Sequence, residues 1–444
     1  MRKTLAAVLV GASLGGSALA QSEPARTLTL ADAFERALTA NPQVGIARGG
    51  VNVAEARRLL SRSLVFPQLS VNGSLTRNSE EASFGEGSDA RVILPEDDWT
   101  YGLQFRQPLF AGLREKRAYD QAKLGIESAN EGLLDTENLI LLQVGIDYLA
   151  MVRAVALAGV EEKNVELARG RKRQATDFYE VGEVTRVDVL RADAGIKSAE
   201  RQLVVAQAAR KAAVSRLRVA LALEGEEDLE GVAPEELLPP LASEVELVQR
   251  AASASPAIQQ ARIAVAIAEL EVKKQRGAYL PVLFLDGGWL RQKSAFPSDD
   301  YGFLALNFNL PIFQGGETRA RVNEAEEQLA QARLHAEDLE RAIREEVRTA
   351  LLEVETSRAL LALAREEQAS AQQEHAQSLE LYRAQETSAL DLETAETALA
   401  DATRRIVFAQ IAIQTAELRV WYLTGELKNA AAAGPAQSQK EQGQ

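Results

Sequence analysis

Two long stretches of this chain, Leu109 to Ala233 and Ile312 to Gly434, contain no proline, although the sequence has 13 prolines in all. Proline breaks the interior of a helix, so its absence leaves each stretch free to form long helices. Both stretches are rich in residues that favour helix, and their apolar residues recur every three or four positions. Each stretch predicts a helix of about 65 residues, a break near Gly182 or Gln385, and a helix of about 37 residues. The longer helix would reach roughly 100 Å, so it needs antiparallel neighbours from the same chain or from other copies.

The two halves of the chain repeat each other, which indicates an internal duplication. QPLFAGLREKRA, beginning at Gln107, parallels LPIFQGGETRAR, beginning at Leu310. At the same offset, DFYEVGEVTRVDVLRADAGI, beginning at Asp177, parallels ELYRAQETSALDLETAETAL, beginning at Glu380. A longer acidic loop, Ser79 to Asp98, distinguishes the first half. We therefore expect one architecture built twice.

The duplication divides the chain into segments. A first repeat covers residues 21–223, with long helices over about 113–223, and a second repeat covers residues 244–427, with long helices over about 316–425. The linker between them, residues 224–243, is rich in Glu and contains three prolines, so it should run over the surface. Residues 428–444 are predicted to be a disordered tail.

Between the prolines of each half the period changes from helical to two, which predicts four strands. They cover about 67–77 and 99–107 in the first half, and about 282–290 and 301–309 in the second. In the first half one face is apolar and the other is polar. The predicted lipid-facing residues are Leu69, Val71, Leu75, Trp99, Tyr101, Leu103 and Phe105, and the predicted lumen-facing residues are Gln68, Ser70, Asn72, Gln104 and Arg106. In the second half only the duplication suggests that Leu283, Leu285 and Trp289 face the lipid too.

Each strand is long enough to cross a bilayer at a tilt. Four strands cannot close, and an open sheet edge cannot lie in lipid, so several copies would have to pool their strands into one barrel. Eight strands from two copies leave an interior filled by side chains, whereas twelve from three copies leave room for water. A pore therefore favours a trimer. From the pattern alone, a soluble sheet packed on helices remains an alternative.

Residues 1–20 have the features of a signal peptide, with Arg2 and Lys3, a short apolar stretch and the small-x-small site Ala18-Leu19-Ala20. No later segment has 18 unbroken apolar residues, so we expect any membrane crossing to use strands. The net charge of −14 argues against a nucleic-acid partner.

Catalytic and cofactor signals are weak throughout the sequence. There is no cysteine, and the two histidines, His335 and His375, are forty residues apart in helical sequence without a third ligand at metal spacing. Gly315-Gly316 lacks the Lys-Ser/Thr ending of a phosphate-binding loop. We expect no enzyme activity, no metal and no cofactor.

The sequence resembles the TolC family of outer-membrane efflux and secretion channels. The resemblance runs from LTLADAFERALTANPQV, beginning at Leu28, through FPQLSVNGS, FRQPLFAGL, YEVGEVTRVDVLRA, YLPVLFL and FNLPIFQGG to RVWYLTGEL, ending at Leu427. It implies a homotrimer with a twelve-stranded β-barrel in the outer-membrane lipid of a Gram-negative bacterium. It also implies an α-helical barrel through the periplasm, whose tip meets a periplasmic adaptor protein and an inner-membrane pump of the RND or ABC type.

The resemblance also implies an acidic periplasmic entrance in the segment LDLETAE, where Asp391 matches the first acidic position of the family. The second acidic position is Thr394 here, and the adjacent Glu393 could compensate if its helix rotates. Threefold repetition would place three Asp391 carboxylates in a ring that attracts cations and raises their pKa by mutual repulsion. The alternative is a lone acid near a helix start, where it makes a favourable contact with the helix dipole.

Several further residues are candidates for contacts at the two helix breaks and in the membrane. The expected adaptor-facing tips comprise Gly182, Glu183, Thr185, Arg186, Asp188, Gln385, Glu386 and Thr387. Tyr382, Arg383 and Arg186 are possible links that close the entrance. A helix–turn–helix link without a partner is the alternative for the tips. Aromatic residues near strand ends predict membrane-interface belts, with core packing as the alternative: Phe66, Trp99, Tyr101, Phe110, Trp289 and Tyr301.

Together these features predict the passive exit duct of a tripartite efflux or type I secretion system. The runner-up is a periplasmic coiled-coil adaptor or scaffold with a small β domain. Duplicated alternating strands of bilayer length favour the channel.

Overall fold

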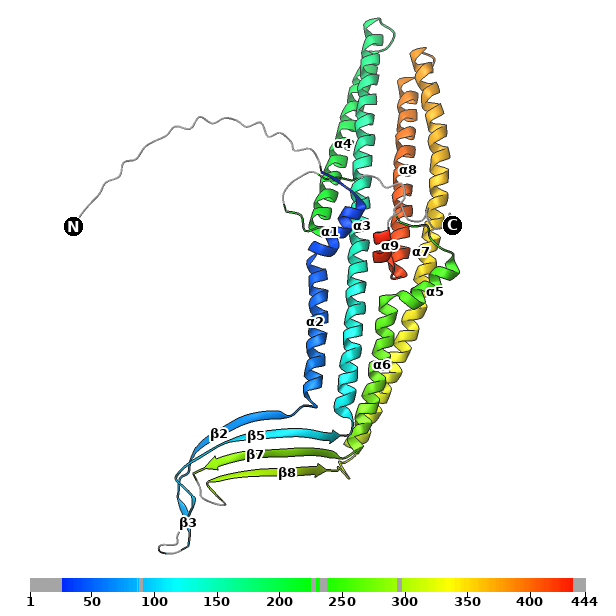
Figure 1. The fold of residues 1–444 in the computed structure, drawn as a ribbon. Coiled ribbons are helices and arrows are strands. Elements are labelled where there is room, and N and C mark those ends of the chain that lie inside the picture. The colour runs from blue at the N-terminus through cyan, green and yellow to red at the C-terminus, as the bar shows by residue number, and fades with distance from the viewer. Residues whose placement is uncertain are drawn as a thin grey trace, which may run out of the picture.

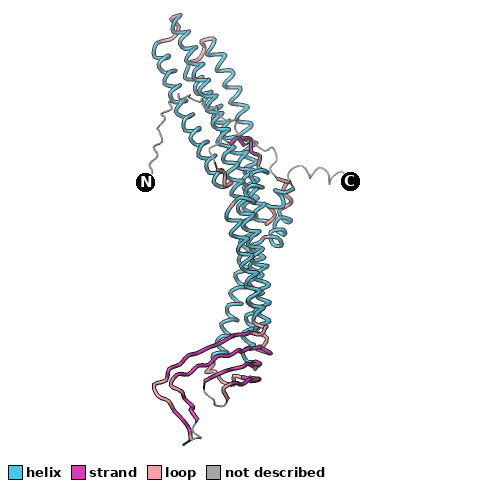
Figure 2. Tube along the Cα trace, turned by 60° about the vertical axis from the view of Figure 1, so that its left-hand side comes forward, coloured by secondary structure: helices cyan, strands magenta, loops and turns pink. Residues whose placement is uncertain are grey.

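The computed structural model of the protein describes residues 26–85, 87, 91–224, 229–231, 238–293 and 298–433, so the predicted signal peptide lies outside the described residues. The molecule is elongated, with a long bundle of helices and a β-sheet that projects from one end of it (Figures 1 and 2). The sheet and the far ends of the helices are therefore the two extremes of the structure.

The helices of the two halves match in length. The first half contains α1 (Leu30–Ala40), α2 (Pro42–Ser63), α3 (Arg114–Glu180) and α4 (Arg186–Ala220), and the second contains α5 (Glu244–Ala254), α6 (Pro256–Arg276), α7 (Glu317–Arg383) and α8 (Ala389–Leu423). Both α3 and α7 have 67 residues, and both α4 and α8 have 35. At about 1.5 Å per residue, α3 and α7 each extend roughly 100 Å, as the proline-free stretches predict.

The main sheet is antiparallel, in the order β2-β5-β7-β8. Its strands are β2 (Gln68–Arg77), β5 (Asp97–Ala111), β7 (Val282–Gln292) and β8 (Asp300–Asn309). The central pair, β5 and β7, joins the two halves of the chain. Strand β5 is longer than the alternating pattern predicted, because it continues past Pro108 through a register shift between Pro108 and Phe110. A bulge accommodates proline, which has no N–H for the ladder.

Three short elements depart from the predictions. The acidic loop contains a hairpin of β3 (Ala82–Phe84) and β4 (Arg91–Leu94), whose strands are too short to show a period. Within the predicted linker, β6 (Leu229–Gly231) pairs in parallel with β1 (Arg26–Leu28). The prediction of a disordered tail is wrong for residues 428–433. They belong to α9 (Leu427–Ala433), an alanine-rich helix that packs on the bundle through the buried Leu427 and Ala430.

The helices are held together at mid-length by a buried core, which we call the mid-belt. In its larger cluster Leu141, Tyr148, Leu149 and Met151 of α3 pack with Leu418 of α8, together with residues of α1, β6 and α9. A second cluster centres on Val347 of α7 and Val420 of α8. Helix α3 is long and apolar enough to cross a membrane by composition, with a mean hydropathy of 1.7 in its most apolar window, but half of that window is buried inside the bundle.

Candidate functional site

The main sheet carries its apolar side chains on one shared face. The register places Leu69 opposite Phe105, and it places Leu285 opposite Leu306. Directly opposite residues share a face, so both halves contribute to one surface. Its members are Leu69, Val71, Leu75, Trp99, Tyr101, Leu103, Phe105, Leu283, Leu285, Trp289, Leu304, Leu306 and Phe308.

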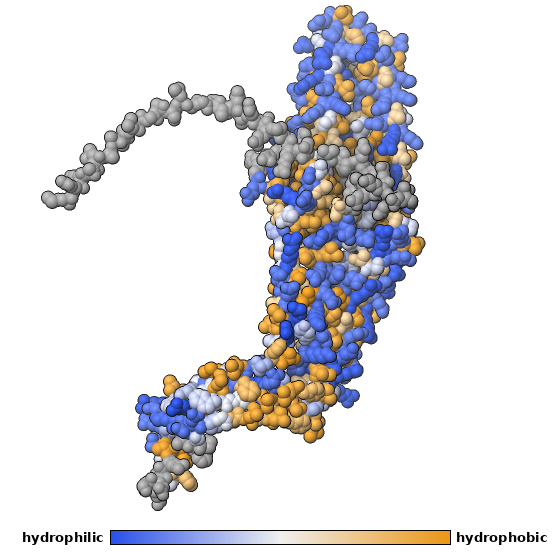
Figure 3. All heavy atoms as spheres, in the orientation of Figure 1, coloured by the Kyte–Doolittle hydropathy of each residue, from blue (hydrophilic) through white to orange (hydrophobic). Residues whose placement is uncertain are grey.

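This apolar face is open rather than packed. Leu75 is 90% exposed and Leu304 is 70% exposed, and hydrophobic residues gather over the sheet in Figure 3. The described helices continue from one end of the sheet instead of covering this face (Figure 1). An exposed apolar surface of this extent suits contact with lipid, and it does not fit a soluble sheet packed on helices.

The opposite face of the sheet is polar and internally paired. Asn72 Nδ2 donates to Gln104 Oε1 at 3.0 Å. The Nε atom of Arg106 lies 2.7 Å from Oδ1 of Asp286, and Asn307 Nδ2 donates to the other oxygen of that carboxylate at 2.6 Å. These groups suit a water-filled interior.

The aromatic residues form two groups at opposite ends of the sheet. Trp99, Tyr101 and Trp289 meet at the end away from the helices, where the ring centroids of Trp99 and Tyr101 are 5.3 Å apart and those of Tyr101 and Trp289 are 6.1 Å apart. Tyr301 also lies at this end, near the start of β8, and the indole N–H of Trp289 donates to Asp300.

The second aromatic group lies beside the helices. Phe66 precedes β2, where the guanidinium of Arg62 lies 5.3 Å from its ring centroid, and Phe110 lies near the end of β5. From Phe110 to Tyr101 the strand extends about 30 Å, which a tilt of about 40° reduces to roughly 23 Å. That height is close to the apolar band of about 25 Å on outer-membrane barrels, so the spacing agrees with two interface belts.

The two helix turns at the far end of the bundle, which we call the helix tips, have similar local geometry. Gly182 supplies a left-handed residue with φ of 84° after α3, and Gln385 takes the same region with φ of 61° after α7. Thr185 caps α4 together with Asp188, and Ser388 caps α8 together with Asp391. The tips touch each other, because the Gln385 amide donates to the Glu183 carboxylate.

Asp391 is occupied by its own helix start. One of its carboxylate oxygens accepts hydrogen bonds from Thr387 Oγ1 at 2.9 Å, from Ser388 Oγ at 2.7 Å and from Ser388 N at 3.1 Å. These bonds, with those from Ser388 and then Thr387 the largest, hold the pKa of Asp391 below its usual value. Asp188 makes the equivalent bonds to Thr185, which likewise lower its pKa. Within one chain the pKa of Asp391 is therefore lowered, whereas an acidic ring would raise it. Such a ring requires neighbouring copies of the chain.

Glu393 and Glu396 join the two helix pairs, which are α3 with α4 and α7 with α8. Arg171 of α3 places its Nε atom 2.8 Å from Glu396 and its Nη1 atom 3.3 Å from Glu393, both on α8. Burial raises the pKa of Glu396, and the charge of Arg171 only partly opposes this shift. A second link connects Arg404 of α8 to Glu161 of α3 at 2.9 Å. Neither link is predicted by the sequence, because pairing between distant helices leaves no local pattern, and the pairing of Glu393 with Arg171 is not predicted for the same reason. Thr394 is exposed and donates to the Leu390 carbonyl of its own helix.

The predicted gate links are placed differently from one another. Tyr382 is buried between the helix pairs, where its ring lies 5.8 Å from that of Phe178. Burial, and then the charge of Asp188, raises the pKa of Tyr382. Arg383 instead pairs with Glu380 of its own helix at 3.0 Å, and Arg186 is exposed with no ion-pair partner among the described residues. Glu386 and Thr387 lie at the tip of the second pair.

A sheet with one lipid-type face, one polar face and two open edges, continued by helices of roughly 100 Å, defines a membrane channel subunit of the outer-membrane type. The family model described as "Outer membrane efflux protein" matches residues 33–223 and 247–426. The chain belongs to this family.

Individual relatives match most of the chain. Outer membrane efflux protein BepC of Brucella suis is 27% identical, over 96% of this chain and 88% of the relative. Outer membrane protein TolC of Salmonella enteritidis is 23% identical, over 96% of this chain and 87% of the relative. Alkaline protease secretion protein AprF of Pseudomonas aeruginosa is 25% identical, over 75% of this chain and 71% of the relative.

Solved structures show the same fold. The structure of CusC superimposes with a TM-score of 0.77 at 19% identity, covering 89% of this chain and 91% of that chain. The CmeC outer membrane channel of Campylobacter jejuni gives a TM-score of 0.76 at 19% identity, covering 90% of this chain and 86% of that chain. Long helices with four strands per chain, as the sequence predicts, are thus confirmed as the TolC-like fold.

The protein is an outer-membrane efflux or secretion channel whose helices extend into the periplasm. Channels of this family are non-enzymatic transport proteins, which confirms the prediction that the chain is not an enzyme. The alternative of a periplasmic adaptor or scaffold is thereby excluded.

Proposed function

We propose that three copies of the chain form one twelve-stranded barrel and one helical tunnel. The observation that carries this proposal is the open sheet, in which β2 and β8 have no outer neighbour among the described residues although one face is apolar. Unpaired N–H and C=O groups in lipid cost several kcal/mol each, so edge β2 of one copy pairs with edge β8 of the next. Twelve strands enclose water, which a conduit needs.

The helical part offers matching edges for the same assembly. Helices α4, α3, α8 and α7 lie in a row from the view of Figure 1, with α4 and α7 outermost. Toward the helix tips both outer helices expose apolar side chains: Val187, Leu190, Val204 and Val219 on α4, and Leu352, Leu360, Leu363 and Leu381 on α7. Packing α7 of one copy against α4 of the next buries both sets and closes the tunnel.

The helix tips form the periplasmic entrance and meet a periplasmic adaptor of an inner-membrane pump, of the RND or ABC type. The exposed turns around Gly182 and Gln385 provide the adaptor-facing surface. Asp391 lines the entrance, and the Arg171 and Arg404 links hold the two helix pairs together in the closed arrangement. Substrates handed over by the pump then pass through passively, as efflux or as type I secretion.

Cross-linking tests the trimer directly, because the natural chain has no cysteine. We would replace Ser74 of β2 and Ala305 of β8, which both lie on the polar face of the sheet, by cysteine in one chain and treat the protein in outer-membrane vesicles with a flexible bis-maleimide. The expected ladder on a denaturing gel contains dimers and ends at trimers. The single variant Ser74→Cys is the control and cannot give the ladder. A ladder that ends at another number, or monomers alone in correctly inserted protein, would contradict the proposal.

A further inference from the structure

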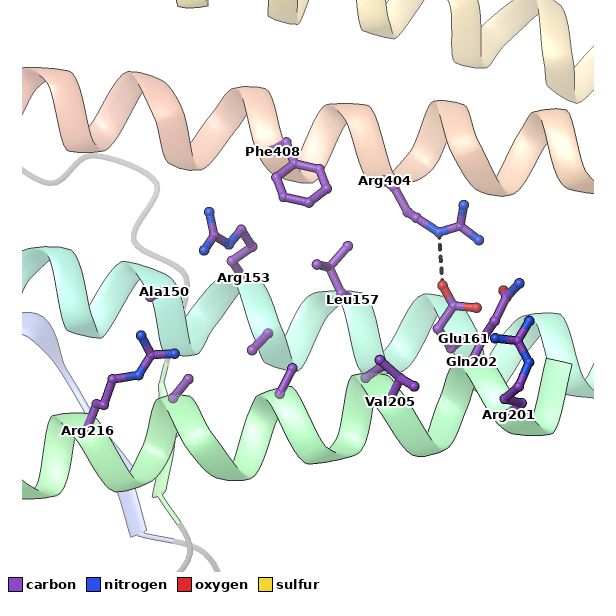
Figure 4. A pocket seen from close by; sticks show the side chains of 14 residues that line it. Ala150, Arg153, Leu157, Glu161, Arg201, Gln202, Val205, Arg216, Arg404 and Phe408 are labelled. Atoms are coloured by element: carbon purple, nitrogen blue, oxygen red, sulfur yellow. Dashed lines mark hydrogen bonds and ion pairs between the residues drawn. The ribbon is translucent and has the colours of Figure 1, made fainter. Parts of the chain in front are cut away.

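A cavity of about 610 Å³ lies between α3, α4 and α8, part of the way from the mid-belt to the helix tips (Figure 4). Its middle is apolar, with Leu157 of α3 and Val205 of α4 facing the space. Alanines such as Ala154 and Ala206 leave the space open because their side chains are short. This volume is typical of sites that hold small organic molecules.

The charges around the cavity are unbalanced. Four arginines line it: Arg153, Arg201, Arg216 and Arg404. The single acid, Glu161, already accepts from Arg404 Nε at 2.9 Å and from Asn164 at 3.0 Å. Among the described residues the other three arginines have no carboxylate within ion-pair distance. The cavity is therefore cationic in a chain whose net charge is −14.

The free arginines are arranged around the apolar middle. Figure 4 shows Arg153 and Arg216 at one end of the cavity, and Arg201 with the Arg404–Glu161 pair at the other. The Arg153 guanidinium lies 5.5 Å from the ring centroid of Phe408, which fixes its position by a cation–π contact. A guanidinium stacked in this way keeps its N–H edge available for an anionic acceptor.

We propose that this cavity binds an amphipathic organic anion. Its carboxylate or sulfonate lies between Arg153 and Arg216, at the end of the cavity away from Glu161, and its apolar body lies over Leu157 and Val205. Guanidinium groups recognise such head groups through paired, charge-assisted hydrogen bonds. The apolar walls add the free energy of burying the body. The site belongs to the single chain, so it does not depend on the proposed trimer.

The test uses the purified mature protein in a non-ionic detergent and isothermal titration with 2-naphthalenesulfonate. We expect saturable binding of one molecule per chain that weakens as salt is added. The double variant Arg153→Gln with Arg216→Gln should weaken binding by about tenfold or more, because two charge-assisted contacts are lost. The matched control is Arg365→Gln on α7, an exposed arginine without an ion-pair partner among the described residues, which should leave binding unchanged.

A second variant separates shape from charge. Ala206→Leu fills the middle of the cavity without changing any charge, and we expect it to abolish binding while circular dichroism stays unchanged. The cationic analogue 2-naphthylmethylammonium should not bind the natural protein. The proposal would be overturned if binding did not saturate or if the cation bound as well as the anion. It would also be overturned if the double variant Arg153→Gln with Arg216→Gln bound the anion as tightly as the natural protein. If the double variant Arg153→Gln with Arg216→Gln instead lowers only the stability of the oligomer, the two arginines bind carboxylates of a neighbouring copy, and the proposal is wrong.

Discussion

Helices α3 and α8 meet in two different ways along their length. At the mid-belt the contact is apolar and close, and Leu418 packs so tightly on Gly145 that an added Cβ would lie 2.8 Å from its Cδ1 atom. Toward the helix tips the same two helices are joined by ion pairs, Arg404 with Glu161 and Arg171 with Glu396. Separating apolar surfaces exposes them to water at full cost, whereas separated ion pairs regain hydration. We therefore expect the mid-belt to stay fixed and the tip half to be the part of the bundle that opens.

The largest expected effect comes from the mid-belt. Leu418→Ala removes a fully buried side chain and should lower the free energy of unfolding by about 3 kcal/mol. Denaturant unfolding followed by circular dichroism measures this change. The matched control is Leu363→Ala on the exposed surface of α7, assayed as monomer in detergent, which should change stability far less. If both variants lowered the free energy of unfolding equally, the mid-belt would not be the fixed part of the bundle.

The next effect concerns the closing links, the ion pairs of Arg171 with Glu396 and of Arg404 with Glu161 that we propose hold the entrance closed. Arg171→Ala leaves the buried Glu396 carboxylate unpaired, so it should weaken the closed arrangement by about 1–3 kcal/mol and raise the leak conductance of the channel. The double variant Arg171→Ala with Glu396→Gln should recover part of the closure, since the only carboxylate that still lacks Arg171, Glu393, is part-exposed and can be hydrated. Unfolding stability should change little. A leak unchanged by Arg171→Ala would show that these ion pairs do not hold the entrance.

The closing links also predict a pH dependence. Burial raises the pKa of Glu396 above its ordinary 4.5, and Glu393 adds to this shift while Arg171 opposes it. In the separated arrangement the carboxyl is hydrated, so the closed arrangement binds more protons and gains stability as the pH falls through the raised pKa. We expect leak to decrease as the pH is lowered from 7 toward 4.5, and Glu396→Gln to abolish this dependence. The pKa values of Asp188 and Asp391 are lowered below 3.8, so these groups titrate outside that window.

The smallest stability effect comes from the two caps, and the duplication provides its control. Asp188→Asn and Asp391→Asn remove the same capping interactions, so each should cost about 1 kcal/mol of local helix stability. Only Asp391→Asn should also reduce cation selectivity and enlarge the leak, because only Asp391 is proposed to line the entrance. Planar-bilayer recordings at several salts compare the two variants. Identical selectivity in both would eliminate the acidic ring.

The sequence predicted the parts of the fold that depend on local patterns. Long proline-free stretches and strict alternation specify helices and strands, and the repeat located the second turn at Gln385, although Gln385 has no glycine-like freedom. Elements that depend on distant contacts were missed, such as α9, which forms because Leu427 docks on the mid-belt. The link between Arg171 and Glu396 was missed for the same reason, since charged residues on a helix predict a solvated surface unless the neighbouring helix is known.

The central claim is that copies of this chain form a water-filled conduit with a constricted entrance. Single-channel recording of the purified mature protein in a planar bilayer, at both polarities and in several salts, tests this claim most directly. The account predicts small, stable, cation-selective conductance steps that grow in the Arg171→Ala variant. A folded helical oligomer that never conducts, under conditions in which a control porin does, would contradict it.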